Sequence, residues 1–302
     1  MQLRKLGVVL LALLLAAMAI VPCVSAADVN PDTVGNAYQD MINPVSNGDI
    51  DLFDKMGLQR PEIEKKTIPL KRYDESKEII DRIMTLGKIP NDAKSVIGLC
   101  DFGSDQILLI DNEDSVLALS YDGKQVKTTK IMPKLLGEMK ETGPATRLSL
   151  NQNSFGDTVT TNLLTKLYSI SIESPESASA VKTIYMVIKT RTDDYKNYFG
   201  EIRASLTVNG KFYVNYGVSI SSIIDQSSYY VTYPYTMCSY VHTPSGTGST
   251  AVQINAHLKT GAAFARAQMD NWVGENAWMN LNPWDGGSQS TWMSGNGDGC
   301  NG

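Results

Sequence analysis

Histidine and cysteine are scarce in this chain, and their scarcity limits the chemistry that it can perform. The 302 residues include two histidines and four cysteines, and no two cysteines form a CxxC pair. A structural zinc site needs four such ligands at short spacings, so the sequence does not predict one. The nucleophile elbow G-x-S-x-G is also missing, and with it the most recognisable mark of a serine hydrolase.

Clusters of basic residues are absent as well. The chain has 27 Lys and Arg against 32 Asp and Glu, and its formal net charge is −5. Nucleic acids and anionic membrane surfaces are recognised through basic patches, so neither is an expected partner. The acceptor tripeptide Asn-x-Ser/Thr does not occur, which excludes N-glycosylation at that motif.

One long apolar run is present, and it is too short to span a bilayer. Leu6–Val21 is apolar, follows Arg4 and Lys5, and precedes the small-residue sequence Val24-Ser25-Ala26. A membrane-spanning helix needs about 20 apolar residues. The pattern is typical of a secretory signal peptide over residues 1–26, so we expect cleavage after Ala26 and a secreted chain without a transmembrane segment.

Three cysteines remain after the expected cleavage. An exported protein favours disulfides, and Cys238 and Cys300 lie in the same half of the chain. A bridge between them would fix the glycine-rich tail, so we predict this pair. Cys100 lies in an apolar run and is predicted to be a free, buried core residue.

The charged and aromatic residues divide the chain into two halves. Residues 28–145 hold 36 charged side chains, whereas residues 146–302 hold 21. All four tryptophans and 11 of the 14 tyrosines follow residue 145. We therefore predict a charged α+β module over residues 27–145 and an aromatic-rich, mostly antiparallel β-sandwich over residues 146–302. The boundary is expected at Thr142-Gly143-Pro144.

The first half shows helix and strand patterns in turn. Asp74 is expected to cap a helix that ends at Gly87 and carries Ile79, Ile80, Ile83 and Met84 on one face. Pro133 is expected to open a short helix with Leu135, Leu136 and Met139. Between these helices, turn sequences separate four predicted strands, over 96–100, 106–111, 115–120 and 125–130.

The second half alternates apolar and polar residues, as strands do. An alanine-rich stretch is expected to form a helix over residues 260–273. Within residues 202–220 we predict a hairpin with the three-residue loop Val208-Asn209-Gly210. In that loop Gly210 would be left-handed, because only this register keeps the apolar side chains on one face. Further strands are predicted near 146–151, 158–174, 180–192, 229–242 and 250–258.

The two histidines flank a turn sequence, and their expected separation argues against a shared metal ion. A regular hairpin centred near Gly246 would pair His257 with residue 236, six residues from His242. At about 3.3 Å per residue, that places the imidazoles roughly 20 Å apart. We therefore predict no metal site at the histidines.

Calcium is the one cofactor with any sequence signal. A loop resembling an EF-hand has polar residues at only some of the required positions. The glycine-rich tail matches the start of such a loop, but the chain ends before the closing ligand. The first loop comprises Asn43, Asn47, Gly48, Ile50 and Asp54, and the tail comprises residues 294–299.

The concentration of aromatic residues is the strongest functional signal. Tyrosines crowd one strand region, and tryptophans crowd the end of the chain among Asn, Asp and Gln. Flat rings beside amides and carboxylates suit a sugar, whose CH face stacks while its hydroxyls form hydrogen bonds. Alternatively, these rings close the sandwich core. The predicted ligand-binding residues are Tyr233, Tyr235, Trp278, Trp284 and Trp292.

These patterns lead to two hypotheses about function. The first is an exported, non-catalytic recognition protein that binds a glycan or another protein at the cell surface or in the medium. The second is a secreted hydrolase whose residues 27–145 act as a propeptide or inhibitory module. Acidic residues are available for glycoside chemistry, but the sequence does not show two of them facing each other.

Overall fold

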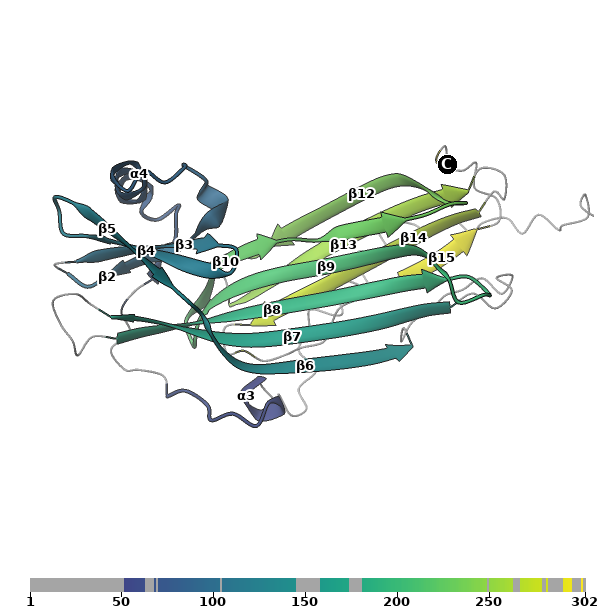
Figure 1. Ribbon diagram of the computed structural model, residues 1–302, viewed down its shortest axis with the longest axis horizontal. Helices are drawn as coiled ribbons and strands as arrows, with labels where there is room; N and C mark the ends of the chain where they lie inside the picture. Colours follow the sequence, from purple (N-terminus) through teal and green to yellow (C-terminus); the bar gives the residue numbers. More distant parts are fainter. Residues whose placement is uncertain are drawn as a thin grey trace, which may run out of the picture. The chain divides into compact units, whose positions relative to one another are not determined.

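The computed structural model describes a protein made mostly of antiparallel β-strands (Figure 1). The expected signal peptide and the strand predicted near 146–151 lie outside the described residues. Those residues are 52–62, 68, 70–103, 105–144, 158–173, 181–248, 250–262, 267–278, 281, 290–294 and 300.

In the described part of the chain, the elements fall into three antiparallel sheets and two short helices. The first sheet has the strand order β1-β2-β3-β4-β5, the second β10-β9-β8-β7-β6 with β11 also paired to β9, and the third β12-β13-β14-β15. In chain order the elements are α3 (Leu52–Lys55), β1 (Leu70–Lys71), α4 (Lys77–Leu86), a 3-10 turn (Ala93–Ser95), β2 (Val96–Asp101), β3 (Gln106–Asn112), β4 (Ser115–Tyr121), β5 (Val126–Ile131), β6 (Lys134–Pro144), β7 (Thr158–Glu173), β8 (Val181–Lys196), β9 (Ile202–Asn215), β10 (Ser219–Asp225), β11 (Ser228–Val231), β12 (Thr236–Ser245), β13 (Ala251–Ala262), β14 (Ala267–Trp278) and β15 (Ser290–Ser294).

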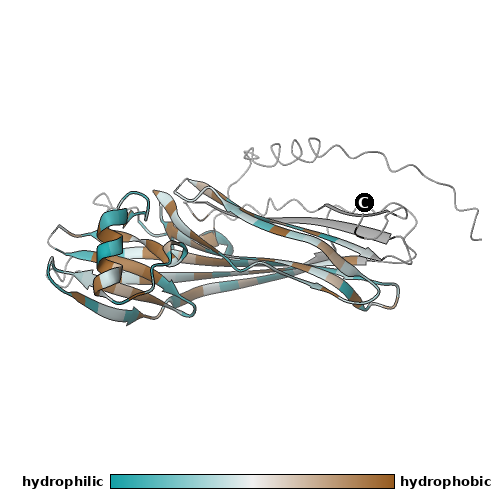
Figure 2. Ribbon diagram, turned by 90° about the horizontal axis from the view of Figure 1, so that it is seen from above, coloured by the Kyte–Doolittle hydropathy of each residue, from teal (hydrophilic) through white to brown (hydrophobic). Residues whose placement is uncertain are grey.

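Helix α4 covers one face of the first sheet. Its apolar side buries Ile80, Ile83 and Met84 against Leu99 and Leu108, and its polar side faces outward (Figure 2). Strands β2, β3, β4 and β5 lie where the alternation and turn sequences predict them.

The start of α4 differs from the expectation. The N-cap is Ser76, whereas Asp74 forms an ion pair with Arg72 at 3.2 Å. The expected cap residue therefore lies two positions before the observed N-cap.

The second sheet has apolar residues on both of its faces. One face packs against the first sheet through residues such as Ile170, Ile184 and Tyr213. The other face packs against the third sheet, where Val208 and Phe212 of β9 meet Ile254 of β13. Two antiparallel sheets packed in this way are consistent with a β-sandwich.

Strand β9 corrects the predicted hairpin. It runs without a turn from Ile202 to Asn215, and Gly210 pairs with Lys189 on one side and Asp225 on the other. Gly210 is not among the glycines with positive φ in the described chain. The apolar residues keep the same phase before and after Asn209-Gly210, which is the pattern of one continuous strand. The Asn-Gly pair was therefore misread as a turn.

The helix expected after Pro133 is also wrong, because β6 occupies these residues. Its register against β7 shifts between Leu135 and Gly137, which is a β-bulge. A bulge adds one residue, so Leu136 and Met139, three apart, both pack against the core between the second and third sheets. The bulge thus imitates the spacing of a helix.

The alanine-rich helix expected over residues 260–273 is replaced by a strand pair. Ala262 ends β13 and pairs with Ala267, the first residue of β14. The helix preference of alanine is worth only a few tenths of a kcal/mol per residue over most other residues. Twelve consecutive backbone pairs between β13 and β14 outweigh it.

The change from the first to the second sheet falls between β5 and β6, at residues 132–133. The expected division at residue 145 remains a prediction.

Lys211 of β9 joins the first and second sheets, with its Nζ 2.8 Å from Asp111 Oδ1 and 2.7 Å from the carbonyl oxygen of Glu113. Tyr213 donates a further hydrogen bond to Asp111. The ion pair is almost fully buried, so it fixes the β3–β4 turn against the second sheet.

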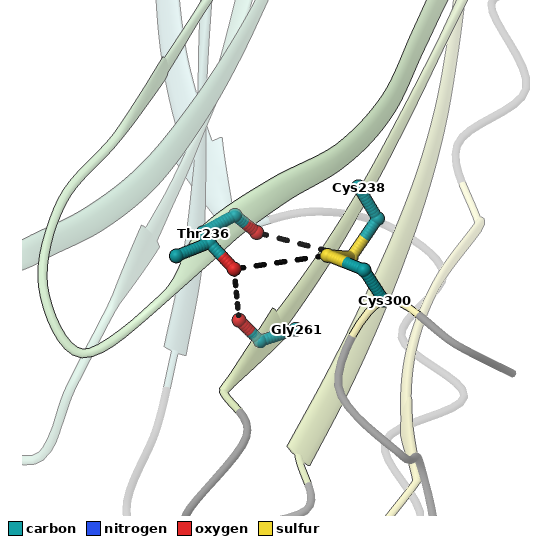
Figure 3. Close-up of a disulfide and its surroundings, with 4 residues drawn as sticks. All are labelled: Thr236, Cys238, Gly261 and Cys300. Carbon is teal, nitrogen blue, oxygen red and sulfur yellow. Dashed lines mark hydrogen bonds between the residues drawn. A yellow bond between two sulfur atoms is a disulfide. The ribbon is translucent and has the colours of Figure 1, made fainter.

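Cys238 of β12 and Cys300 are joined by a disulfide, as the sequence predicts, and Cys100 is free and buried (Figure 3). The hydroxyl of Thr236 lies beside the bridge, 3.7 Å from Cys300 Sγ, and donates to the carbonyl of Gly261 at 3.2 Å. The bridge therefore attaches residue 300 to the edge strand of the third sheet.

Candidate functional site

The candidate site lies where the edge strands of the second and third sheets meet. β10 and β11 pair with the same side of β9, and Gln226 and Ser227 interrupt them. The amide of Gln226 bonds to the carbonyl of Asn209 at 2.8 Å, so the interruption stays close to β9. The opposite edge is β12, the outermost strand of the third sheet.

An imidazole and a carboxylate bridge these two edges. His242 Nδ1 lies 2.6 Å from Asp225 Oδ2. The other oxygen of Asp225 accepts hydrogen bonds from the amide and hydroxyl of Ser227, at 2.9 and 2.6 Å. The Asp225 side chain is only 7% exposed, whereas that of His242 is 40% exposed. A buried carboxylate thus orients an imidazole whose outer edge is accessible.

Two tyrosines complete the cluster. Tyr240 stacks on His242 with ring centroids 5.3 Å apart, and Tyr229 tilts against Tyr240 at 4.7 Å. Desolvation, reinforced by the charge of Asp225, raises the pKa of Tyr240 to about 12. Its hydroxyl is buried and has no hydrogen-bond partner in the described chain. We call Asp225, Tyr229, Tyr240 and His242 the edge cluster.

Strand register explains why these four side chains meet. Tyr229 pairs with Leu206 and Asp225 with Gly210, both on the β9 face that packs against the third sheet. Tyr240 and His242 are two residues apart, so they share one face of β12. All four side chains therefore lie on the faces of the edge strands that point towards the other sheet. They fill the space between the second and third sheets at this edge of the sandwich.

The position of the histidines differs from the expectation. His257 pairs with Val241, and His242 pairs with Ala256, so the hairpin is centred on residue 249 instead of Gly246. Pro244 does not end the strand. β12 is an edge strand, so one of its sides has no neighbouring strand and a residue without an amide proton is tolerated there. The two histidines occupy neighbouring positions but opposite faces of the third sheet, since adjacent residues alternate between faces.

Of the predicted ligand residues, the structure describes the side chains of Tyr233 and Tyr235. Tyr233 is exposed, and its carbonyl accepts a hydrogen bond from Arg203 at 2.7 Å. Tyr235 instead packs edge-on against Tyr195 at 5.9 Å.

The tryptophans are described only in part. Trp278 ends β14 and Trp292 lies in β15, where the structure describes the backbone alone. Trp284 lies outside the described residues. Their role as a ligand face stays a prediction.

The pairing of Asp225 with His242 was missed by sequence reasoning. The alternating pattern Tyr240-x-His242 could have placed these two rings on one face. The partner carboxylate could not have been found, because it comes from the edge of another sheet.

The expected absence of a metal site stays a prediction. No group of three or more His, Cys, Asp or Glu side chains in these ranges could hold a metal ion. Of the EF-hand-like residues, Asp54 lies in α3 and forms an ion pair with Arg60. The other four, and all of the tail except residue 294, lie outside the described residues.

Compared with known proteins, the chain matches no family model, no curated protein and no solved structure. In the part of the chain that the structure describes, no helix has the length and apolar character needed to cross a membrane.

Proposed function

We propose that this chain is an exported recognition protein that binds a glycan through the edge cluster. One observation carries the proposal, the accessible imidazole of His242 held by Asp225 among tyrosine rings. Sugar hydroxyls form hydrogen bonds with imidazoles and carboxylates, and the CH face of a sugar stacks on aromatic rings. The cluster offers both kinds of contact at one surface.

Exposed tyrosines beside the cluster extend this surface. Tyr229 of β11 is exposed, as is Tyr233 in the connection to β12. Tyr230 is exposed too, but it directly follows Tyr229 and therefore lies on the other face of β11. The hydrogen bond from Arg203 to the carbonyl of Tyr233 fixes this connection against β9. A ring with a restrained backbone loses less conformational entropy on binding, which favours recognition.

Export is supported by two independent features. The N-terminal sequence has the pattern of a signal peptide, and the Cys238–Cys300 disulfide suits an oxidising compartment. Intact-mass measurement of the native secreted protein tests this part of the proposal. It should give the mass of a chain that begins at Ala27 and contains one disulfide.

A secreted hydrolase is the second candidate, and the Asp225–His242 pair is the observation that favours it. A carboxylate that orients an imidazole is the general-base half of a nucleophilic site. Such a site also needs a hydroxyl within reach of Nε2. None hydrogen-bonds to this atom within the described ranges, so recognition is the better-supported proposal.

An array of immobilised oligosaccharides tests glycan binding, followed by calorimetry with the strongest hit. Tyr229→Ala and His242→Gln should each weaken binding by at least tenfold. The control is Phe199→Ser, an exposed ring beyond the start of β9. Along β9, Ile202 is four residues from Leu206, the partner of Tyr229, and eight residues from Gly210, the partner of Asp225, or roughly 13 and 26 Å. The control should therefore bind normally.

Two results would overturn the proposal. One is the absence of any glycan hit, and the other is binding that survives both cluster substitutions. Cleavage of a bound oligosaccharide, lost in His242→Gln but retained in Phe199→Ser, would establish the hydrolase instead.

A further inference from the structure

A second feature suited to a ligand lies in the first sheet. A cleft of about 490 Å³ opens beside β4 and β5, and the end of β7 forms its opposite wall. Its volume is within the usual range for small-molecule sites. Apolar side chains line part of it, including Ile107, Ile131 and Ile172, while Ser120 and Thr129 contribute hydroxyls.

A buried carboxylate lines this cleft. Asp105 is only 5% exposed, and its Oδ2 has no hydrogen-bond partner in the described chain. Two hydrogen bonds fix the backbone here. The carbonyl of Asp105 accepts from the amide of Phe102 at 2.9 Å, and Asp101 Oδ1 accepts from the amide of Gly103 at 3.1 Å. A buried carboxylate without a partner is costly, so a cation that reached it would be bound favourably.

The charges around the cleft favour a cation over an anion. Asp122 and Glu173 line the rim with Asp105, and Lys127 is the one basic residue among the lining side chains. Oδ1 of Asp122 already accepts the amides of Lys124 and Gln125 at 2.8 Å each. Asp105 is the buried acid of the three, so its carboxylate gains most from a cationic ligand.

The same residues argue against a bare metal ion. Within the described chain the acids of the cleft do not form a set of three that could hold one. A carboxylate beside apolar walls and hydroxyls instead suits an ammonium group attached to a carbon skeleton. We propose that the cleft binds a small organic cation, with Asp105 as the anchor for a primary ammonium group.

Calorimetry with three probes of one shape tests the charge requirement. The probes are cyclohexylmethylamine, cyclohexylmethanol and cyclohexanecarboxylate, at neutral pH and low salt. The amine should bind at least tenfold more tightly than the alcohol, because only the amine carries a positive charge that pairs with the carboxylate. The carboxylate should not bind measurably. Equal affinity for amine and alcohol would overturn the proposal.

Two variants then locate the binding. Asp105→Asn preserves shape and removes a buried charge, so it should fold while weakening amine binding at least tenfold. Asp114→Asn changes an exposed acid in the β3–β4 turn and should bind like the wild type. Unchanged amine affinity in Asp105→Asn, or an equal loss in Asp114→Asn, would show that Asp105 is not the anchor.

Discussion

Gly210 of β9 lies directly against Ile254 of β13, so that a Cβ on Gly210 would be 2.6 Å from Ile254 Cδ1. The same Cβ would be 2.6 Å from the ring of Phe212. These distances are far below van der Waals contact. The glycine therefore serves close packing between two sheets, and its conformational freedom is not used.

Gly210→Ala should destabilise the protein by about 1–3 kcal/mol through overpacking. Ile254→Val removes Cδ1, one of the two atoms at 2.6 Å, and alone should cost about 0.5–1.5 kcal/mol. In the double variant the two losses should partly cancel, because the valine makes room for the new methyl group. Urea unfolding measures all three. Losses that simply add would show that the two residues do not compete for space.

Asp111→Ala should be among the most damaging substitutions in the first sheet. It leaves Lys211 buried without its charge partner and removes the acceptor of Tyr213. Breaking a buried pair in this way costs about 3–5 kcal/mol. The control Asp114→Ala changes an exposed acid of the same turn and should cost no more than about 0.5 kcal/mol. Similar stabilities for both variants in denaturant melts would show that the buried Asp111–Lys211 ion pair does not stabilise the fold.

Tyr240→Phe should leave the stability at neutral pH unchanged or raise it by up to about 1 kcal/mol. The hydroxyl that it removes is buried and has no partner in the described chain. Removing such a group relieves a desolvation cost. Tyr213→Phe is the matched control, since it removes a hydroxyl that is bonded to Asp111 and should destabilise. A clear loss of stability in Tyr240→Phe would reveal a partner for its hydroxyl.

Tyr240 should also shape the response to alkaline pH. Its pKa in the folded protein is raised to about 12 by desolvation and by Asp225, whereas an unfolded tyrosine titrates near about 10. Its contribution to stability is therefore complete below the unfolded pKa and is lost as the pH rises towards the folded one. The unfolding free energy should fall more steeply above about pH 10 in the wild type than in Tyr240→Phe. Parallel curves would exclude this effect.

Cys100 should resist thiol reagents in the folded protein. Burial raises the pKa of its thiol to about 12, and the thiolate is the reactive form. Ellman's reagent at pH 8 should detect almost no thiol in the native protein and one thiol per chain in guanidinium chloride. Rapid labelling under native conditions would show that the sulfur is accessible.

Local patterns predicted much of this fold. Alternation and turn residues located β2, β3, β4 and β5, because these strands are short and each is bounded by its own turn. The apolar face of α4 was equally visible in the spacing of Ile80, Ile83 and Met84. The Cys238–Cys300 pair followed from the small number of possible partners.

Features that depend on distant parts of the chain were not predictable. The register of β12 against β13 is set by a ten-residue strand, a twelve-residue strand and a bulge near Met237, so a short turn sequence could not fix it. The bulge in β6 gave strand residues a helical spacing. The edge cluster needs two sheets to stack before Asp225 can meet His242, and no local pattern encodes that contact.

The Cys238–Cys300 bridge also determines what happens if the chain is cut. The two cysteines are 62 positions apart, and the segment between them contains nearly all of the third sheet. A single break by a protease anywhere in this segment leaves both fragments covalently joined. The strand that carries Tyr240 and His242 would stay attached to its neighbours, so a nicked molecule could keep its edge cluster intact. In the exported protein that we propose, such tolerance of damage would prolong the working life of the molecule.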